Sequence, residues 1–582
     1  MIKRLSPLFP YLRRYWRSFA WGGLALLIYN CSKALLPLLI GTAVDGLRHD
    51  LSAHTIARYT LMVLGVAIVS GVFLYLMRQI IIGASREIEF DLRNDLFAHL
   101  ELQPPSFFQR HRTGDIMARS TNDLNAVRQL LGPAIMYSAN TVIFTAAALP
   151  FMLRISPHLT LYAFLPLPFA SILVQYFGAK IHTRFERIQA MFSDISAQAE
   201  ENFSGARLIR AFAQEEAQIA AFEESNREYI NRSLRLARLM AMLWPTLELV
   251  LGLSLMVTLL VGGREVVLHH ITVGQFTSYN VYMVQLTWPM IAIGWVVNLV
   301  QRGAASVTRI HELMLEVPAI DDSNVSPALA EKPIQGHLSF KHLSFTYATG
   351  PEVLHDISLD IPAGTSLAIV GPTGAGKSTL TALIPRLQDS PAGMVLIDGH
   401  AITEYPLATL RSAIGVVPQE TFLFSSSIHD NVAFGVPNAT REEVIAAARV
   451  SHIAEEILEF PHGFDTIVGE RGVTLSGGQK QRTAIARAVL RNPRILILDD
   501  ALASVDTYTE EQILSALNSV MQDRTTILIA HRVSTARSAD RIAVLVDGRI
   551  SELGTHEELL ALGGYYSELA EKQSLEEELA TV

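Results

Sequence analysis

The stretch LAIVGPTGAGKSTL, residues 367–380, decides the fold of the second half of the chain. Its four apolar residues predict a buried strand, and the loop Gly371-x4-Gly376-Lys377-Ser378 follows the strand and opens a helix. In such a loop the glycines let backbone N–H groups surround a phosphate. Lys377 neutralises phosphate oxygens, and the Ser378 hydroxyl binds Mg²⁺. The stretch therefore predicts an α/β domain with a nucleoside triphosphate site.

A second apolar run, RILILDDALASVD at 494–506, ends in two carboxylates, Asp499 and Asp500. On its own such a run is most often an ordinary buried strand. Beside a phosphate loop, however, the strand is expected to bring Asp499 to the same metal ion. Asp500 is then in the position to hold a water molecule. The rate of hydrolysis at the site then depends on how well an aspartate positions that water.

The composition indicates a membrane part. Of the 582 residues, 50% are hydrophobic and 18% are charged, a balance that is unusual for a soluble protein. Residues 1–320 contain 28 Lys and Arg against 22 Asp and Glu, and the remainder contains 19 against 34. The single cysteine, Cys31, excludes an intrachain disulfide framework, and its apolar surroundings predict a small buried thiol.

Six apolar segments in the first half are long enough to cross a membrane as helices, which takes about 20 residues. They are 18–45, 59–82, 132–154, 158–179, 241–263 and 274–301. With the N-terminus inside, the inner segments 1–17, 83–131 and 180–240 hold 20 Lys and Arg, whereas the outer loops hold four. This asymmetry predicts a cytoplasmic N-terminus.

The inner connections are long enough to form helical stalks. Residues 180–240 contain almost no Pro or Gly except Gly205, so the flanking spans are expected to continue as helices about 35–40 Å beyond the bilayer. A composition break at 315–336 indicates a linker, after which short strands alternate with helices. The predicted domains are a membrane domain of six helices at 1–314, a linker at 315–336 and a nucleotide-binding domain at 337–582.

Further motifs resemble one family over nearly the whole chain. LSGGQKQR at 475–482 resembles the signature of ABC ATPases, and the order of motifs over 337–570 is similar to theirs. FFQRHRTGDIMARSTND at 107–123 and ENFSGARLIRAFAQEE at 201–216 resemble the first coupling-helix region and the second intracellular stalk of ABC exporter half-transporters. The implied fold is a membrane α-helical bundle with long cytoplasmic extensions, followed by an α/β P-loop ABC ATPase domain.

The resemblance implies a role for individual residues, with ATP and Mg²⁺ as cofactors. The residues implied in ATP binding are Tyr347 as the adenine-stacking aromatic, then Gly371, Thr373, Gly374, Gly376, Lys377, Ser378 and Thr379 of the phosphate loop, Ser476, Gly477, Gly478 and Gln479 of the signature, and Asp506 of the D-loop. The implied metal ligands are Ser378, Gln419 and Asp499, and the implied catalytic residues are Asp500, His531 and Gln419.

The family's dimer architecture bears on Asp500. In the family the residue after the Walker B aspartate is usually Glu, and the signature caps ATP bound to the opposite subunit. Losing one methylene withdraws the carboxylate by about 1 to 1.5 Å, which can lower a rate about 100-fold. The chain thus resembles the degenerate-site subunit of a heterodimeric multidrug-type exporter, whose signature completes the partner's active site. The alternative is a homodimeric exporter or lipid flippase with an adequate Asp500, and the retained His531 favours it.

The implied function is ATP-driven export of amphipathic or hydrophobic compounds (drug, lipid or peptide) by alternating access. Glu248 and Lys33 lie in predicted spans, where a charged residue either marks a functional site or pairs with a neighbour. An ATP-gated channel or regulatory subunit is a further alternative, and a soluble ATPase with an unrelated anchor is disfavoured. We expect a multi-pass protein of the inner (plasma) membrane with a cytoplasmic ATPase domain and no nucleic-acid partner.

Overall fold

The computed structural model describes residues 5–348, 350–469, 472–503 and 507–580. The chain divides into two compact units, of which the first comprises Met1–Glu101 and Arg112–Glu316 and the second comprises Leu102–His111 and Val317–Val582. The last helix of the first unit, α14, ends at Leu315, and the first strand of the second unit, β1, begins at Leu338.

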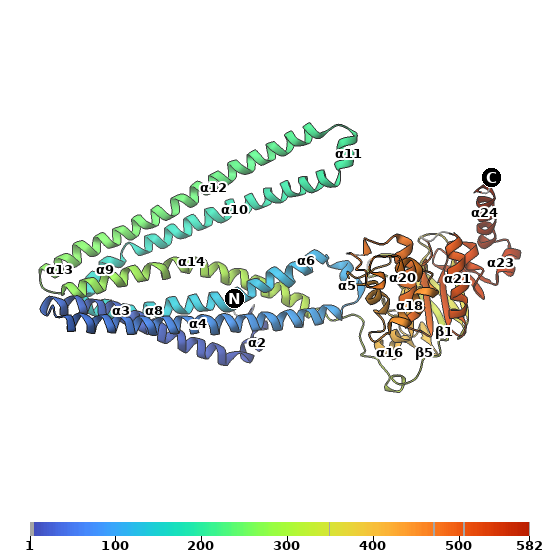
Figure 1. The fold of residues 1–582 in the computed structure, drawn as a ribbon, viewed down its shortest axis with the longest axis horizontal. Coiled ribbons are helices and arrows are strands. Elements are labelled where there is room, and N and C mark those ends of the chain that lie inside the picture. Colours follow the sequence, from blue (N-terminus) through green and yellow to red (C-terminus); the bar gives the residue numbers. More distant parts are fainter. Residues whose placement is uncertain (1–4, 349, 470–471, 504–506, 581–582) are drawn as a thin grey trace. The chain divides into compact units, whose positions relative to one another are not determined.

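The first unit consists of helices, and the long ones dominate its structure (Figure 1). They are α2 (Phe9–Arg14), α3 (Trp16–His49), α4 (Ala53–Glu101), α6 (Thr113–Ala118), α7 (Leu124–Gln129), α8 (Ile135–Ile155), α9 (Pro157–Phe164), α10 (Leu167–Ser204), α11 (Ala206–Ala211), α12 (Glu215–Val257), α13 (Gly263–Val267) and α14 (Val273–Leu315). Short π-helical turns at Arg119–Asp123, Leu130–Ala134 and Thr258–Gly262 join neighbouring helices without a break in direction. This is the helical bundle that the apolar segments predict.

Five of the six predicted spans correspond to helices that are long and apolar enough to cross a membrane, among the residues that the structure describes. The fourth predicted span, 158–179, does not. It is divided between α9 and the start of α10, with Leu165 and Pro166 between them, because proline lacks the N–H that a continuous helix needs. The prediction of a buried Cys31 is also wrong, since this residue is exposed on α3.

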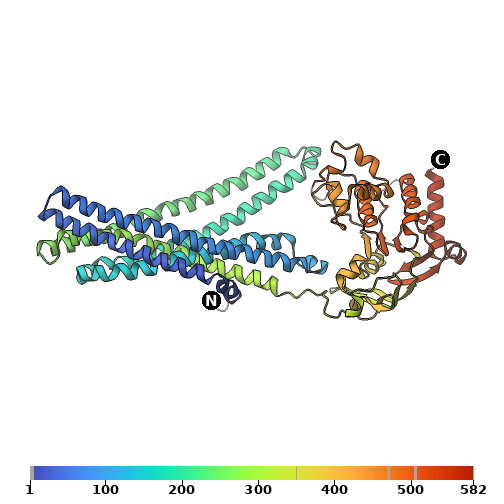
Figure 2. The same ribbon diagram turned by 60° about the horizontal axis from the view of Figure 1, so that its bottom comes forward.

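The predicted stalks are confirmed. Helices α10 and α12 run through 180–240 and are joined by the short α11, and Gly205 lies at the break between α10 and α11. Figures 1 and 2 both show α10 and α12 side by side along most of their length. A run of good helix formers without Pro or Gly is sufficient to explain this extension beyond the apolar segments.

The second unit contains two sheets and, among the described residues, eleven α-helices besides short 3-10 turns. Its strands are β1 (Leu338–Thr346), β2 (Glu352–Ile361), β3 (Ser366–Val370), β4 (Val395–Ile397), β5 (His400–Ala401), β6 (Ile414–Val417), β7 (Ile495–Asp499), β8 (Thr525–Ile529), β9 (Arg541–Val546) and β10 (Arg549–Gly554). Its helices, apart from α5 (Pro105–Arg110), are α15 (Lys377–Leu383), α16 (Leu407–Ser412), α17 (Ile428–Ala433), α18 (Arg441–Val450), α19 (Ala454–Leu458), α20 (Gly477–Leu490), α21 (Thr507–Met521), α22 (Val533–Ala536), α23 (His556–Leu562) and α24 (Tyr565–Ala580).

The larger sheet has the strand order β10-β9-β3-β8-β7-β6, and all neighbours except β10 and β9 are parallel. The central strands β3, β7 and β8 are buried at every position, which explains why their sequences are almost continuously apolar. In β3, Leu367 and Ile369 pack into one core with α15 and the smaller antiparallel sheet β2-β1-β4-β5, whereas Ala368 and Val370 pack into a second core with α20 and α21. The carboxyl ends of β3, β6, β7 and β8 therefore meet at one edge, where ligands bind in α/β sheets.

Candidate nucleotide-binding site

The phosphate loop connects β3 to α15, as the sequence predicts. Gly371 has φ +149°, and a Cβ on it would lie 2.0 Å from the carbonyl oxygen of Leu545 on β9. Gly376 has φ +96° and caps the start of α15. A side chain at Gly371 would require displacement of the β9 backbone, and one at Gly376 would be strained by the positive φ. Thr373 and Gly374 are exposed on the loop between them.

Lys377 is the first residue of α15 and is 6% exposed. Its Nζ donates to the carbonyl oxygens of Gly371 (2.8 Å) and Pro372 (2.9 Å), so the ammonium group lies over the loop that precedes it. Burial lowers the pKa of Lys377, and the carboxylates Asp500 and Asp499 oppose this shift. A buried cation held by loop carbonyls is well placed for an anionic ligand.

The two halves of the predicted metal site lie together. The Ser378 hydroxyl donates to Oδ1 of Asp499 over 3.0 Å, although 121 residues separate them in sequence. Asp499 ends the buried strand β7, and burial raises the pKa of its carboxyl, against the opposing hydrogen bond from Ser378. A desolvated carboxylate beside a hydroxyl is an oxygen donor set of the kind that Mg²⁺ prefers.

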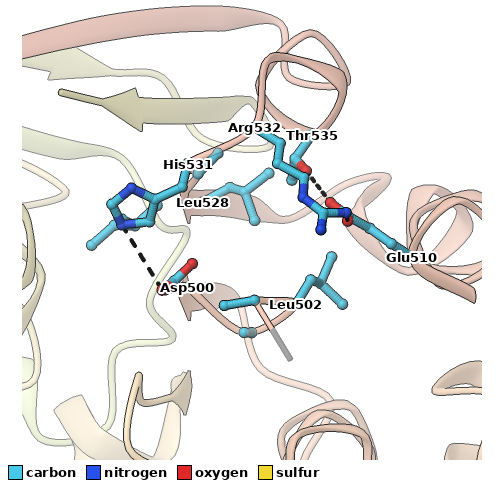
Figure 3. Close-up of a pocket in the computed structure, with 11 residues that line it drawn as sticks. Asp500, Leu502, Glu510, Leu528, His531, Arg532 and Thr535 are labelled. Carbon is cyan, nitrogen blue, oxygen red and sulfur yellow. Dashed lines mark hydrogen bonds and ion pairs between the residues drawn. The ribbon is translucent and has the colours of Figure 1, made fainter. Parts of the chain in front are cut away.

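Asp500 and His531 face each other across the ends of β7 and β8 (Figure 3). Oδ2 of Asp500 lies 3.9 Å from Nε2 of His531, and the Asp500 side chain is 14% exposed. The backbone of Asp500 is left-handed, with φ +50°. Aspartate adopts this conformation more readily than most residues. Gln481 of α20 donates to the carbonyl oxygen of Asp500 over 3.4 Å and so links this turn to α20.

These side chains border a cavity of about 180 Å³ that also includes a buried ionic cluster. Glu510 of α21 is 3% exposed and accepts hydrogen bonds from Arg532 and Thr535, which come one and four residues after His531. In Figure 3 Arg532 and Thr535 point toward Glu510 and away from Asp500. Of the two carboxylates labelled in Figure 3, Asp500 is the one that faces His531.

Tyr347 and Gln419 lie at the two flanks of the loop region. The hydroxyl of Tyr347, just after β1, bonds to Oγ1 of Thr379 over 2.9 Å, which links the predicted adenine platform to α15. Gln419 is exposed two residues beyond the end of β6. Because β6 pairs in parallel with β7, Gln419 follows its strand at the same edge as Asp499.

The signature begins α20. Ser476 is the N-cap residue and forms a capping box with Gln479. The Ser476 hydroxyl accepts from the backbone N–H of Gln479 (3.2 Å), and the side-chain Oε1 of Gln479 accepts from the Ser476 N–H (2.9 Å). Ser476 and Gly477 are exposed, and Gly478 is partly exposed. Gln479 also donates to Glu456 over 2.9 Å. The start of α20 presents free N–H groups and no acidic side chain in its first turn, as an anion site requires.

The remaining predicted residues lie elsewhere. Asp506 falls outside the described residues. Lys33 on α3 lies over the ring of Phe144 on α8, with 4.6 Å from Nζ to the ring centroid, and is 5.8 Å from that of Tyr29. Glu248 is exposed on α12.

Comparisons with known proteins agree with this geometry. Residues 19–290 match the ABC transporter transmembrane region, and residues 354–503 match the ABC transporter family. The chain is 38% identical over 574 residues to the multidrug resistance-like ATP-binding protein MdlA of Escherichia coli strain K12, covering 97% of this chain and 96% of that protein. This chain belongs to the ABC transporter family.

Other relatives indicate the branch of the family. The transporter is 35% identical over 583 residues to an ATP-dependent lipid A-core flippase of Syntrophus aciditrophicus strain SB, covering 100% of this chain and 95% of that protein. The structure of a bacterial Atm1-family ABC exporter with ATP bound superimposes with a TM-score of 0.78 at 30% identity, covering 97% and 98% of the two chains. The predicted fold class and half-transporter layout are confirmed, and the protein is an ATPase coupled to transport.

Sequence reasoning about this ABC transporter missed the cluster of Glu510, Arg532 and Thr535. One signal was available. Glu510 lies on the same face of α21 as the core residues Ile513 and Leu517, because residues three and seven apart align on a helix. A carboxylate on an apolar helix face requires a buried partner.

Proposed function

We propose that this half-transporter exports amphipathic compounds as one half of a heterodimer, and that its own ATP site hydrolyses slowly. The observation that carries the proposal is Asp500. It directly follows the end of β7, with a side chain one methylene shorter than the glutamate usual in the family, and we assign it the role of holding the water. The intact signature at the start of α20 would then complete the partner's active site.

The residues present fit Mg²⁺ and ATP. When bound, Mg-ATP supplies the phosphoryl group that is transferred to water. Ser378, Asp499 and Gln419 would hold the metal, and Lys377 and the loop N–H groups would hold the phosphates. Tyr347 would stack on the adenine, and Ser476, Gly477 and Gly478 would contact nucleotide on the opposite subunit. Asp506 of the D-loop is proposed as a further contact.

Asp500 limits the chemistry through its reach. A general base must lie within hydrogen-bond distance of the water it orients. A carboxylate displaced by about 1 to 1.5 Å can lower the rate about 100-fold. In this chain the carboxylate also turns toward Nε2 of His531, 3.9 Å away. We infer that the site binds ATP well and turns it over slowly.

A homodimer is the second candidate, and the Asp500–His531 pair favours it. His531 retains the position from which an imidazole reaches a γ-phosphate, and its Nε2 is close enough to Asp500 for the two to act on one water. In that case the two sites of a symmetric dimer are equivalent, and Asp500 suffices for turnover.

A measurement of ATP turnover distinguishes the heterodimer from the homodimer. The purified chain is assayed in lipid nanodiscs, alone and with a candidate partner subunit. For a heterodimer we expect slow turnover by the chain alone, and fast turnover in the mixture that survives Asp500→Asn in this chain. Fast turnover by the chain alone that Asp500→Asn abolishes would establish the homodimer and remove the heterodimer.

The cargo and membrane are proposed from the relatives. The names of the two curated relatives, a multidrug resistance-like protein and a lipid A-core flippase, support an amphipathic or hydrophobic cargo. The charge asymmetry of the loops supports an inner-membrane protein with its N-terminus and ATPase domain in the cytoplasm. ATP-dependent uphill accumulation of an amphipathic dye in inverted vesicles tests this direction, and passive equilibration would instead indicate a channel.

A further inference from the structure

The C-terminal helix α24 contacts the backbone that directly follows the His531 side chain. Nε2 of Gln573 donates to the carbonyl oxygen of His531 over 2.8 Å, and Oε1 of Gln573 accepts from the N–H of Val533 over 2.8 Å. A single amide side chain thus bridges the two peptide groups that flank Arg532. Both bonds are of ordinary length and together use the donor and the acceptor of the amide.

The second of these bonds satisfies the start of α22. The first N–H groups of a helix have no partner within the helix. Arg532, the N-cap residue of α22, provides no side-chain cap. Gln573 provides that acceptor from another helix 40 residues away. The turn between β8 and α22, which carries His531, is therefore defined partly by a residue of α24.

Helix α24 is itself anchored at its first turn. Tyr566 is fully buried in the core and bonds through its hydroxyl to Nδ1 of His556 over 2.8 Å. The Glu552 carboxylate of β10 accepts from the N–H groups of Tyr565 (2.6 Å) and Tyr566 (3.3 Å). Gln573 lies seven residues after Tyr566 and so projects from the same face of the helix. The anchor therefore fixes where Gln573 can reach.

The ionic cluster of Glu510, Arg532 and Thr535 also restricts the turn that carries His531. Glu510 accepts from the side chains of Arg532 and Thr535, whereas Gln573 bonds to the main chain of His531 and Val533. The two sets of bonds alternate along residues 531–535. The imidazole of His531 is 43% exposed, so its position depends on the backbone that carries it. A small displacement of this turn therefore changes where the imidazole lies relative to Asp500.

We propose that Gln573 is a positioning residue for His531, through which the C-terminal helix sets the geometry of the ATP site. This inference rests on the proposed role of His531 in hydrolysis. Gln573 touches no reacting atom and acts by restricting the backbone of the imidazole-bearing turn. Losing one or two neutral hydrogen bonds of this kind corresponds to about a 3- to 10-fold effect on the rate.

The test uses Gln573→Met in the full-length chain, because methionine keeps the length and volume of glutamine and removes both hydrogen bonds. The control is Gln522→Met, the same change at an exposed position after α21. The first readout is hydrogen exchange of the Val533 amide in nucleotide-free protein. The others are the melting temperature, and the rate and ATP affinity of single-turnover hydrolysis with protein in excess.

We expect Gln573→Met to speed exchange at Val533 and to lower the single-turnover rate about 3- to 10-fold, with ATP affinity and melting temperature within error of the control variant. Unchanged exchange at Val533, or an unchanged rate in a protein whose rate His531→Ala does lower, would overturn the inference. If His531→Ala leaves the rate unchanged, the proposed role of His531 fails, and the inference fails with it.

Discussion

Asp500 combines a left-handed backbone with a short carboxylate. Asp500→Glu restores the reach of the family's usual glutamate but places a longer side chain at φ +50°. We expect turnover at this chain's site to rise about 10- to 100-fold, with a small loss of stability because glutamate is less suited to this conformation. ATP turnover and thermal unfolding of the variant measure the two effects.

The matched control is Asp523→Glu. Asp523 is an exposed aspartate with φ +64° in the turn before β8, and nothing places it at the site. It should show the stability loss without any gain in turnover. No increase of turnover in Asp500→Glu would show that reach does not limit hydrolysis here.

Asp499 gives a prediction with a pH dependence. Burial raises the pKa of its carboxyl, so the fold favours the protonated form. The stability that protonated Asp499 contributes to the fold is fully present below the unfolded-state pKa of about 3.9. It is lost as the pH rises through the raised pKa of the folded protein. At pH 7 the charged group therefore destabilises the nucleotide-free protein.

Asp499→Asn should thus raise the melting temperature of the Mg²⁺-free and nucleotide-free protein at pH 7, and the gain should shrink as the pH is lowered toward 4. The same variant should lose Mg²⁺-dependent ATP binding, because an amide is a poorer ligand than a carboxylate. A lower melting temperature than wild type at pH 7 would contradict the argument.

At the scale of elements, an ion pair joins the π-helical turn at Arg119–Asp123 to α14. Asp123 is 8% exposed and accepts from Oγ of Ser306 and Nε of Arg309, each over 2.8 Å. Arg309→Met leaves that carboxylate with one of its two partners. We expect a loss of about 1 to 3 kcal/mol of stability in this region, because a buried charge left without its cation is costly.

Proteolysis of the detergent-solubilised protein measures this loss, with faster cleavage expected around 119–135. The control is Arg302→Met, an exposed arginine on the same helix seven residues earlier. Equal cleavage rates in the two variants would mean that the pair does not stabilise the contact between these helices.

At the scale of the whole molecule, a single chain leaves much apolar surface exposed. In the most apolar window of α4 only 6% of the residues are buried within the chain. Beyond the membrane spans, Leu208 and Phe212 at the end of the α10–α12 hairpin are 63% and 68% exposed. Patches of this kind mark protein interfaces. Relatives of the exporter type imply a dimer, in which a second chain would cover them.

We therefore expect Phe212→Ser to lower the dimer fraction in native mass spectrometry and the rate of ATP turnover, each by about 3-fold or more. This magnitude assumes that the substitution loses about 1 kcal/mol of apolar burial at the dimer interface. The control is Leu562→Ser, a leucine of the second unit with 66% exposure. A dimer fraction that matches the control would place the interface away from the tip of this hairpin.

Local patterns sufficed for much of the site. A run of apolar residues, glycines at fixed spacing and a lysine predicted the strand, the loop and the helix, because those choices depend on backbone geometry within about ten residues. The meeting of Ser378 and Asp499 also followed, since the parallel strands of one sheet have their carboxyl ends at the same edge, even where β8 lies between β3 and β7. In contrast, the apolar content of 158–179 predicted a continuous span, and the backbone at Leu165 and Pro166 interrupts it.

The sequence by itself determined the type of nucleotide-binding domain and the membrane helices that local signals encode. Only the tertiary structure decided that Asp500 lies 3.9 Å from His531, that Glu510 holds the turn after His531, and that Gln573 bridges this turn from the C-terminal helix. The physical reason is that these contacts follow from helix packing and not from the order of strands in the sheet. Contacts between residues 22 to 42 positions apart depend on how helices pack on a shared core, and no short pattern of residues encodes that packing.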